Sequence, residues 1–131
     1  MPLPQITMSL AALFAIMIVI LGVQVSLRRA KLKATHGDAN DETLRRRIRA
    51  HGNFIEYAPL AAVVVGLLEM GGAASAVTLA VAIAFGIARI VHALGMLYTS
   101  TPATRAAAMV LQNTAFITSA ALLAKMVFDV A

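Results

Sequence analysis

Three polar residues recur at helical spacing near the middle of the chain. Arg49, Asn53 and Glu56 fall within about 60° of one another on a helix that turns by about 100° per residue, so they share one face. Extended backward, the same face includes Glu42 and Arg45. Guanidinium groups bind carboxylates, and a carboxylate binds an ammonium group. The face therefore has the chemistry to bind a small molecule that carries both charges.

A second set of polar residues lies in the apolar segment 75–97. Arg89 and His92 are three residues apart and Met96 follows one turn later, so one helical face presents a cation, an imidazole and a thioether. The depth of Arg89 in this segment is comparable to that of Glu56 in the preceding one. A structural ion pair between these two side chains is thus an alternative to a ligand, and His92 has the alternative role of a packing residue.

Arg105 falls in the first turn of a helix that begins near Pro102. The N-terminal end of a helix carries partial positive charge, so an arginine there suits the binding of an anion better than it stabilises the helix. The alternative is a cation that only anchors the chain at the cytoplasmic side of a membrane. His36, His51 and His92 lack the spacing of metal ligands, and we expect no metal site.

The composition places these residues in a membrane protein. Of 131 residues, 60% are hydrophobic and 13% are charged, which is not the composition of a soluble domain. A helix of about 20 residues crosses a hydrocarbon core of about 30 Å. Four stretches have the apolar character and the length to do so: 6–27, 54–70, 75–97 and 106–127.

These stretches predict one domain over residues 1–131, an all-α integral membrane bundle of four transmembrane helices. A cleaved signal peptide is the alternative for the first stretch. Its positive residues should precede the apolar run, whereas Arg28 and Arg29 follow it. With no cysteine in the chain, Cys-ligated zinc and a protein thiol nucleophile are excluded, so any sulfur chemistry needs a thiol from the substrate.

The charges predict the orientation of the bundle. The net charge of +5 is a local feature, which argues against a nucleic-acid binder. The loop between the first two stretches carries most of the basic residues: Arg28, Arg29, Lys31, Lys33, Arg45, Arg46, Arg47 and Arg49. Because Lys and Arg are retained on the cytoplasmic side, this loop is cytoplasmic and both termini lie outside.

The second helix reaches beyond the membrane. Asn40 or Asp41 can cap a helix whose first turn carries Glu42. If that helix continues to Met70 it is about 45 Å long at about 1.5 Å per residue, so its first turns project into the cytoplasm. Its polar face then enters the membrane at the inner edge, where an unpaired carboxylate such as Glu56 costs several kcal/mol.

The inner edge therefore collects many basic residues together with Asn53 and Glu56. Binding of anionic lipid explains the outermost arginines but not Asn53 and Glu56. A ligand with carboxylates for the arginines and an ammonium group for Glu56 would satisfy the whole set. A zwitterionic peptide such as glutathione is of that kind.

The segment RAHGNFIEYAP, residues 49–59, resembles the signature RAxxNxxExxP of the MAPEG family, the membrane-associated proteins of eicosanoid and glutathione metabolism. The resemblance implies a four-helix bundle assembled as a homotrimer, with glutathione bound between neighbouring subunits near the cytoplasmic face. Eicosanoid-type members have tyrosines where this chain has His92 and Met96. The chain thus resembles the bacterial branch and the microsomal glutathione transferases, which implies a bacterial inner membrane.

The resemblance also implies roles for residues of the signature. Arg49 and Asn53 would bind carboxylate and backbone groups of glutathione. Glu56 would bind its amino group, and Tyr57 would contact a polar group nearby.

Outside the signature, the resemblance implies that Arg28 or Arg29, at the end of the first helix, joins the glutathione site. Arg105 matches the arginine that activates the thiol. Arg89 and His92 complete the expected set of glutathione-binding residues.

The implied activity is that of a glutathione transferase, with peroxidase activity as a variant of the same chemistry. The pKa of a free thiol is about 8.5 and the thiolate is the reactive species, so a fixed arginine would activate glutathione. The thiolate would then attack a lipophilic electrophile that arrives through the bilayer, or reduce a lipid hydroperoxide. Glutathione is here a co-substrate, and the partners expected are the bilayer and a second, lipophilic substrate.

Two other functions remain open from the sequence. A small multidrug transporter also has four short helices and a membrane carboxylate, but that carboxylate should lie in mid-bilayer, whereas Glu56 lies among arginines at the inner edge. A non-catalytic scaffold of the same fold would bind a lipid or a peptide without chemistry. Loss of Arg105 would indicate a scaffold, and Arg105 is present.

The predicted orientation can be tested by labelling. Because the chain has no cysteine, Ala34→Cys and Ala73→Cys each introduce a single thiol, in the first and the second loop. An impermeant maleimide should label intact cells that carry Ala73→Cys and not those that carry Ala34→Cys. The reverse pattern would place the polar face on the outside of the cell.

Overall fold

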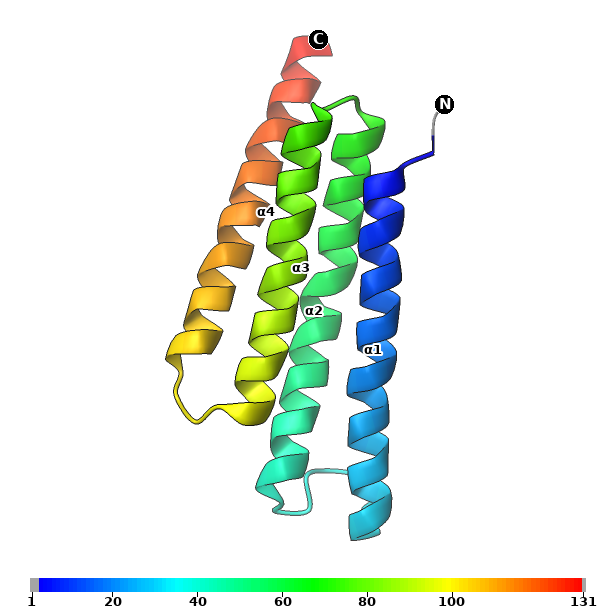
Figure 1. The fold of residues 1–131 in the computed structure, drawn as a ribbon, viewed down its shortest axis with the longest axis vertical. Helices are drawn as coiled ribbons and strands as arrows, with labels where there is room; N and C mark the ends of the chain where they lie inside the picture. The colour runs from blue at the N-terminus through cyan, green and yellow to red at the C-terminus, as the bar shows by residue number, and fades with distance from the viewer. Residues whose placement is uncertain (1–2, 131) are drawn as a thin grey trace.

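The computed structural model describes residues 3–130, and within that range the chain forms four α-helices and no strand (Figure 1). The helices are α1 (Gln5–Leu32), α2 (Glu42–Met70), α3 (Ser75–Tyr98) and α4 (Ala103–Val130). All four are long and apolar enough to cross a membrane. The expected stretches each lie within one of them, so the prediction of an all-α bundle with four candidate membrane spans is confirmed.

The helices alternate in direction, and each packs against the next along the chain (Figure 1). α2 and α3 form the centre, with α1 on one side and α4 on the other. The start of α1, the α2–α3 turn and the end of α4 lie at one end of the bundle. The loop between α1 and α2 and the turn between α3 and α4 lie toward the other end, which we call the basic end.

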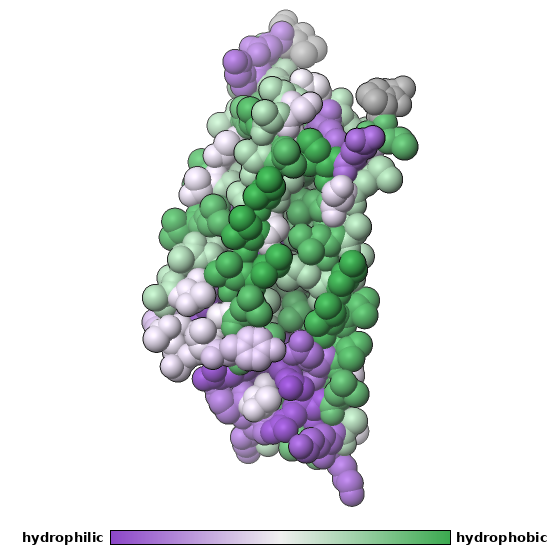
Figure 2. All heavy atoms as spheres, viewed as in Figure 1, coloured by the Kyte–Doolittle hydropathy of each residue, from purple (hydrophilic) through white to green (hydrophobic). Residues whose placement is uncertain are grey.

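Aromatic contacts and small residues hold the helices together. Phe14 of α1 meets the ring of Phe54 of α2 edge-on at 5.5 Å, and Phe85 of α3 lies 4.6 Å from the ring of Phe116 of α4. Buried alanines, among them Ala58, allow close approach between helices. Most of the visible surface is apolar, and hydrophilic side chains gather at the basic end (Figure 2).

Asp41, and not Asn40, caps α2. Its Oδ1 accepts a hydrogen bond of 2.6 Å from the backbone N–H of Leu44. Arg28, near the end of α1, donates two further bonds to the same carboxylate, at 3.0 and 2.6 Å. These bonds from Arg28 and from the backbone lower the pKa of Asp41 to about 2. One side chain thus starts α2 and ties it to α1.

At the opposite end of the bundle, Glu69 of α2 caps α1. Pro4 makes no side-chain cap there. Instead the Glu69 carboxylate accepts bonds from the backbone N–H groups of Ile6 and Thr7, at 2.9 and 2.8 Å, and from the Thr7 hydroxyl at 2.7 Å. A helix start has unpaired N–H groups and partial positive charge, and the carboxylate satisfies both. No local pattern of residues indicates this contact, because it joins residues far apart in the chain.

We expect Glu69→Gln to lower the thermal unfolding temperature of the detergent-purified protein, because it replaces an ionised acceptor by a neutral one. The free energy of unfolding should fall by about 1–2 kcal/mol, as for other helix caps. Glu56→Gln is the matched control, since it is the same change on the same helix and Glu56 makes no hydrogen bond to another described residue. Equal effects of the two substitutions would contradict the capping role.

Candidate functional site

Two adjoining pockets open at the basic end between α2, α3 and α4. The inner pocket has a volume of about 470 Å³ and is lined by Arg49, Asn53, Glu56, His92 and Arg105, among others. The rim pocket, of about 380 Å³, lies toward the loops and is lined by residues that include Glu42, Arg45, Arg46 and Thr99. Three residues line both: Arg49, Met96 and Arg105.

The polar face predicted on α2 exists and lines the inner pocket. Arg49, Asn53 and Glu56 come from successive turns of this helix, and all three contribute to the wall. The side chain of Glu56 is exposed at this wall. Arg49 and Glu56 form no ion pair with any residue that the structure describes. The pocket thus offers one cation and one anion to a ligand.

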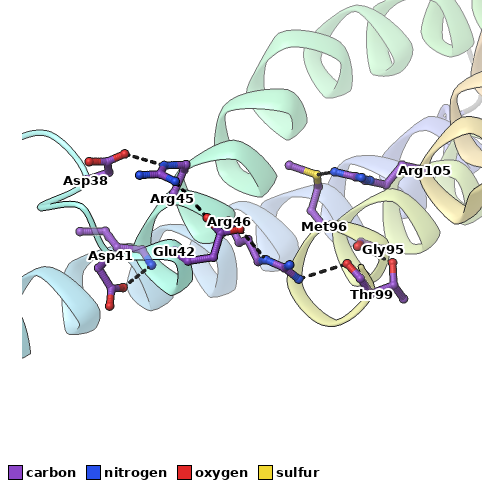
Figure 3. Close-up of polar contacts among 10 residues, drawn as sticks. Asp38, Asp41, Glu42, Arg45, Arg46, Gly95, Met96, Thr99 and Arg105 are labelled. Carbon is purple, nitrogen blue, oxygen red and sulfur yellow. Dashed lines mark hydrogen bonds and ion pairs between the residues drawn. The ribbon is translucent and has the colours of Figure 1, made fainter. Parts of the chain in front are cut away.

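Arg105 of α4 brings a second unpaired cation to both pockets. Its Nη1 donates to the sulfur of Met96 at 3.2 Å (Figure 3), and a thioether is a weak acceptor. Gly95 lets α4 approach this closely, because a Cβ there would lie 3.1 Å from Cγ of Arg105 and 3.4 Å from Thr104. An anion entering either pocket would meet this guanidinium without displacing a carboxylate.

Arg45 and Arg46, which line the rim pocket but not the inner one, already have acidic partners (Figure 3). Arg45 pairs with Asp38 at 2.7 Å and with Glu42 at 3.0 Å. Arg46 pairs with Glu42 at 3.0 Å and donates to the carbonyl of Thr99 at 3.1 Å, which ties α2 to the end of α3. The uncompensated positive charge of the two pockets is therefore that of Arg49 and Arg105.

The ion pair between Glu56 and Arg89, an alternative left open by the sequence, does not form. Arg89 is 1% exposed, and its Nη1 donates to Oδ1 of Asn53 at 2.7 Å. Its guanidinium lies over the ring of Tyr57, 5.3 Å from the centroid. Asn53 and Tyr57 are four residues apart and face α3, whereas Glu56 lies further round α2. Arg89 and Tyr57 are thus beside Asn53, and neither is among the lining residues of the inner pocket.

His92 is 7% exposed and lines the inner pocket at its α3 wall. His92 is therefore a packed residue, which was one of the two roles considered for it, and it can also contact a ligand in the pocket.

Arg28 and Arg29 lie away from both pockets of their own chain. Arg28 is bound to Asp41, and Arg29 donates to the carbonyl of Thr35 at 3.1 Å. Within the described part of the chain, α1 packs on α2 and α3 and not on α4, whose first turn carries Arg105. A single chain therefore does not bring Arg28 or Arg29 together with the other expected site residues.

A buried glutamine in α4 was not predicted from the sequence. Gln112 of α4 is fully buried, and neither atom of its amide has a hydrogen-bond partner among the described residues. Along α4 it lies between Met109, which contacts Arg89, and Phe116, which contacts Phe85. The sequence did contain a signal, because Gln112 shares the buried face of α4 with alanines at helical spacing.

Comparisons with known proteins assign this chain to a family. A model of the MAPEG family matches residues 7–125. Two relatives, both named inner membrane protein YecN, come from Escherichia coli strain K12 and from Escherichia coli O6:H1. Each is 35% identical to this chain over 63 residues, and the match spans about half of both proteins, 48% of each. No solved structure matches the chain.

Proposed function

Because this chain belongs to the MAPEG family, we propose that it is a membrane-bound glutathione-dependent transferase or peroxidase, and that the inner pocket binds glutathione. The four apolar helices and the relatives named inner membrane protein support an integral protein of a bacterial inner membrane. The orientation expected from the loop charges would open both pockets to the cytoplasm.

The observation that carries this proposal is the pattern of unpaired charge in the inner pocket. Among the described residues, Arg49 and Arg105 have no acidic partner and Glu56 has no basic partner. Charged groups at the edge of the hydrocarbon are costly when they are left unpaired. Glutathione offers an ammonium group to Glu56, a carboxylate to Arg49 and an ionisable thiol to Arg105, so its groups complement the charges of the pocket.

Arg105 is the residue we propose to activate the thiol. An arginine keeps its charge in a site of low dielectric constant, and a fixed cation beside the sulfur lowers the pKa of the thiol below its free value of about 8.5. Met96, a weak acceptor, holds the guanidinium in place at 3.2 Å without neutralising it. The thiolate would then compete with the thioether for the same N–H donor and would be the stronger acceptor.

The chemical step needs only this thiolate and a lipophilic partner. In transfer, the sulfur forms a bond to an electrophilic carbon and the leaving group departs with its electron pair. In reduction of a hydroperoxide, two glutathione molecules are oxidised to the disulfide, and the peroxide yields an alcohol and water. The inner pocket lies between membrane helices, so a substrate dissolved in the bilayer has a short path to it.

The glutathione site would be completed by a neighbouring subunit. Arg28 and Arg29 lie on the far side of α2 from Arg105, and the outward surface of α1 is apolar, with Ile16 and Val19 both 61% exposed. In a homotrimer, α1 of one subunit can meet the pocket of the next. This arrangement would bring Arg28 or Arg29 to the carboxylates of the bound peptide.

Replacement of Arg105 by leucine tests the chemistry. We expect Arg105→Leu to abolish the ultraviolet absorbance of the thiolate that wild-type protein shows with glutathione at neutral pH. A pKa lowered by about two units raises the ratio of thiolate to thiol about a hundredfold, so loss of this shift should lower conjugation to an aryl halide by at least tenfold. Binding of S-hexylglutathione, which has no ionisable thiol, should change little.

Arg47→Leu is the matched control, because Arg47 points away from the pockets and donates to the carbonyl of Gln24 at 2.9 Å. A fully active Arg105→Leu would show that another cation activates the thiol. If wild-type protein binds glutathione but forms no thiolate and turns over neither aryl halides nor lipid hydroperoxides, the protein is a binding scaffold and the enzymatic proposal is wrong.

A further inference from the structure

Asn53 contacts the most deeply buried charge of the bundle. Nη1 of Arg89 lies 2.7 Å from the side-chain oxygen of Asn53 and 3.4 Å from its backbone carbonyl. Arg89 is 1% exposed, and Asn53 lies between it and the inner pocket. Asn53 thus contacts Arg89 of α3 on one side, and its other side faces the inner pocket, where a ligand can bind.

The chemistry of arginine determines which way the amide points. An amide has an oxygen that accepts and a nitrogen that donates, and their assignment in a side chain follows from its partners. A guanidinium has only donors, so the atom that faces Arg89 has to be the oxygen. The NH₂ group of Asn53 is then the part left for the pocket.

Among the described residues Arg89 has no other oxygen acceptor as close, since the backbone carbonyl of Asn53 lies 3.4 Å from its Nη1. Its Nη2 has the sulfur of Met109 at 3.7 Å, its face has the ring of Tyr57, and its Nε has no partner among the described residues. It forms no ion pair with a described carboxylate. If the amide of Asn53 were reversed, its N–H donors would face the donors of Arg89, and the buried guanidinium would lose its closest acceptor, which is strongly unfavourable.

We infer that Arg89 is a positioning residue that holds Asn53 with its NH₂ group toward the pocket, so that Asn53 can bind only an acceptor group of the ligand. The inference rests on the proposed function and specifies it. A carboxylate or a peptide carbonyl of glutathione binds at Asn53, and the ammonium group binds elsewhere, at Glu56. Arg89 determines this division without touching the ligand, and its charge polarises the amide and strengthens the donor.

The substitution Asn53→Asp tests the inference, because it keeps the shape of the side chain and makes both of its polar atoms acceptors. One carboxylate oxygen still pairs with Arg89, so the thermal unfolding temperature without ligand should equal or exceed that of the wild type. The other oxygen faces the acceptor group of glutathione, so affinity measured by isothermal titration should fall at least tenfold. The KM for glutathione should rise while kcat at saturation is largely retained, since the thiol is activated at Arg105.

Two further variants serve as controls. Asn40→Asp makes the same change in the loop between α1 and α2, outside both pockets, and should leave affinity unchanged. Arg89→Lys keeps a donor for the Asn53 oxygen and should retain more affinity than Arg89→Leu, which releases the amide.

The outcomes separate the inference from the proposed function. If wild-type protein binds glutathione and Asn53→Asp binds it equally tightly or more tightly, Asn53 uses its oxygen toward the ligand, and the inference is wrong while the proposed function stands. If wild-type protein does not bind glutathione, the proposed function fails, and the stability of Asn53→Asp decides the orientation alone. A clear loss of thermal stability in that variant would overturn the orientation in either case.

Discussion

A charged side chain in or near the hydrocarbon of a membrane is stable only if another group compensates its charge, and this requirement determines much of the structure of the basic end. Arg45 and Arg46 are compensated by acidic side chains of the first loop and of α2. Arg28 is compensated by the carboxylate that caps α2. At the inner pocket, Arg49, Arg105 and Glu56 have no oppositely charged partner among the described residues. The candidate site therefore consists of the charges that the described chain does not neutralise.

Packing holds these charges in place. Gly95 permits the close approach of α4, which brings the guanidinium of Arg105 to the pocket wall at Met96. The side-chain oxygen of Asn53 accepts a hydrogen bond from Arg89, a residue of α3 that is buried between α2 and α4. At the far end of the bundle, Glu69 joins α2 to the first turn of α1. Long-range polar contacts at both ends therefore fix the lengthwise register of helices whose apolar surfaces alone would allow sliding.

The sequence predicted those features that depend on local pattern. Apolar length located the four helices, side-chain chemistry located the cap of α2 within one residue, and a spacing of three and four placed Arg49, Asn53 and Glu56 on one wall. Contacts between helices were harder to predict, because depth in the membrane does not determine rotation about the helix axis. For that reason depth alone left an ion pair between Arg89 and Glu56 open, whereas Arg89 binds Asn53. The capping contact of Glu69 and the burial of Gln112 depend on the same rotation and were not predicted.

We propose that the inner pocket binds a zwitterionic thiol peptide, with its ammonium group at Glu56, a carboxylate at Arg49 and its thiol at Arg105. Isothermal titration of the detergent-purified protein with glutathione, for the wild type and for Glu56→Gln, tests it most directly. We expect saturable binding by the wild type and at least a tenfold weaker affinity for the variant, since a charge-assisted hydrogen bond contributes about 1.5–3 kcal/mol. Equal affinity of the two proteins, or no binding by the wild type, would contradict the account.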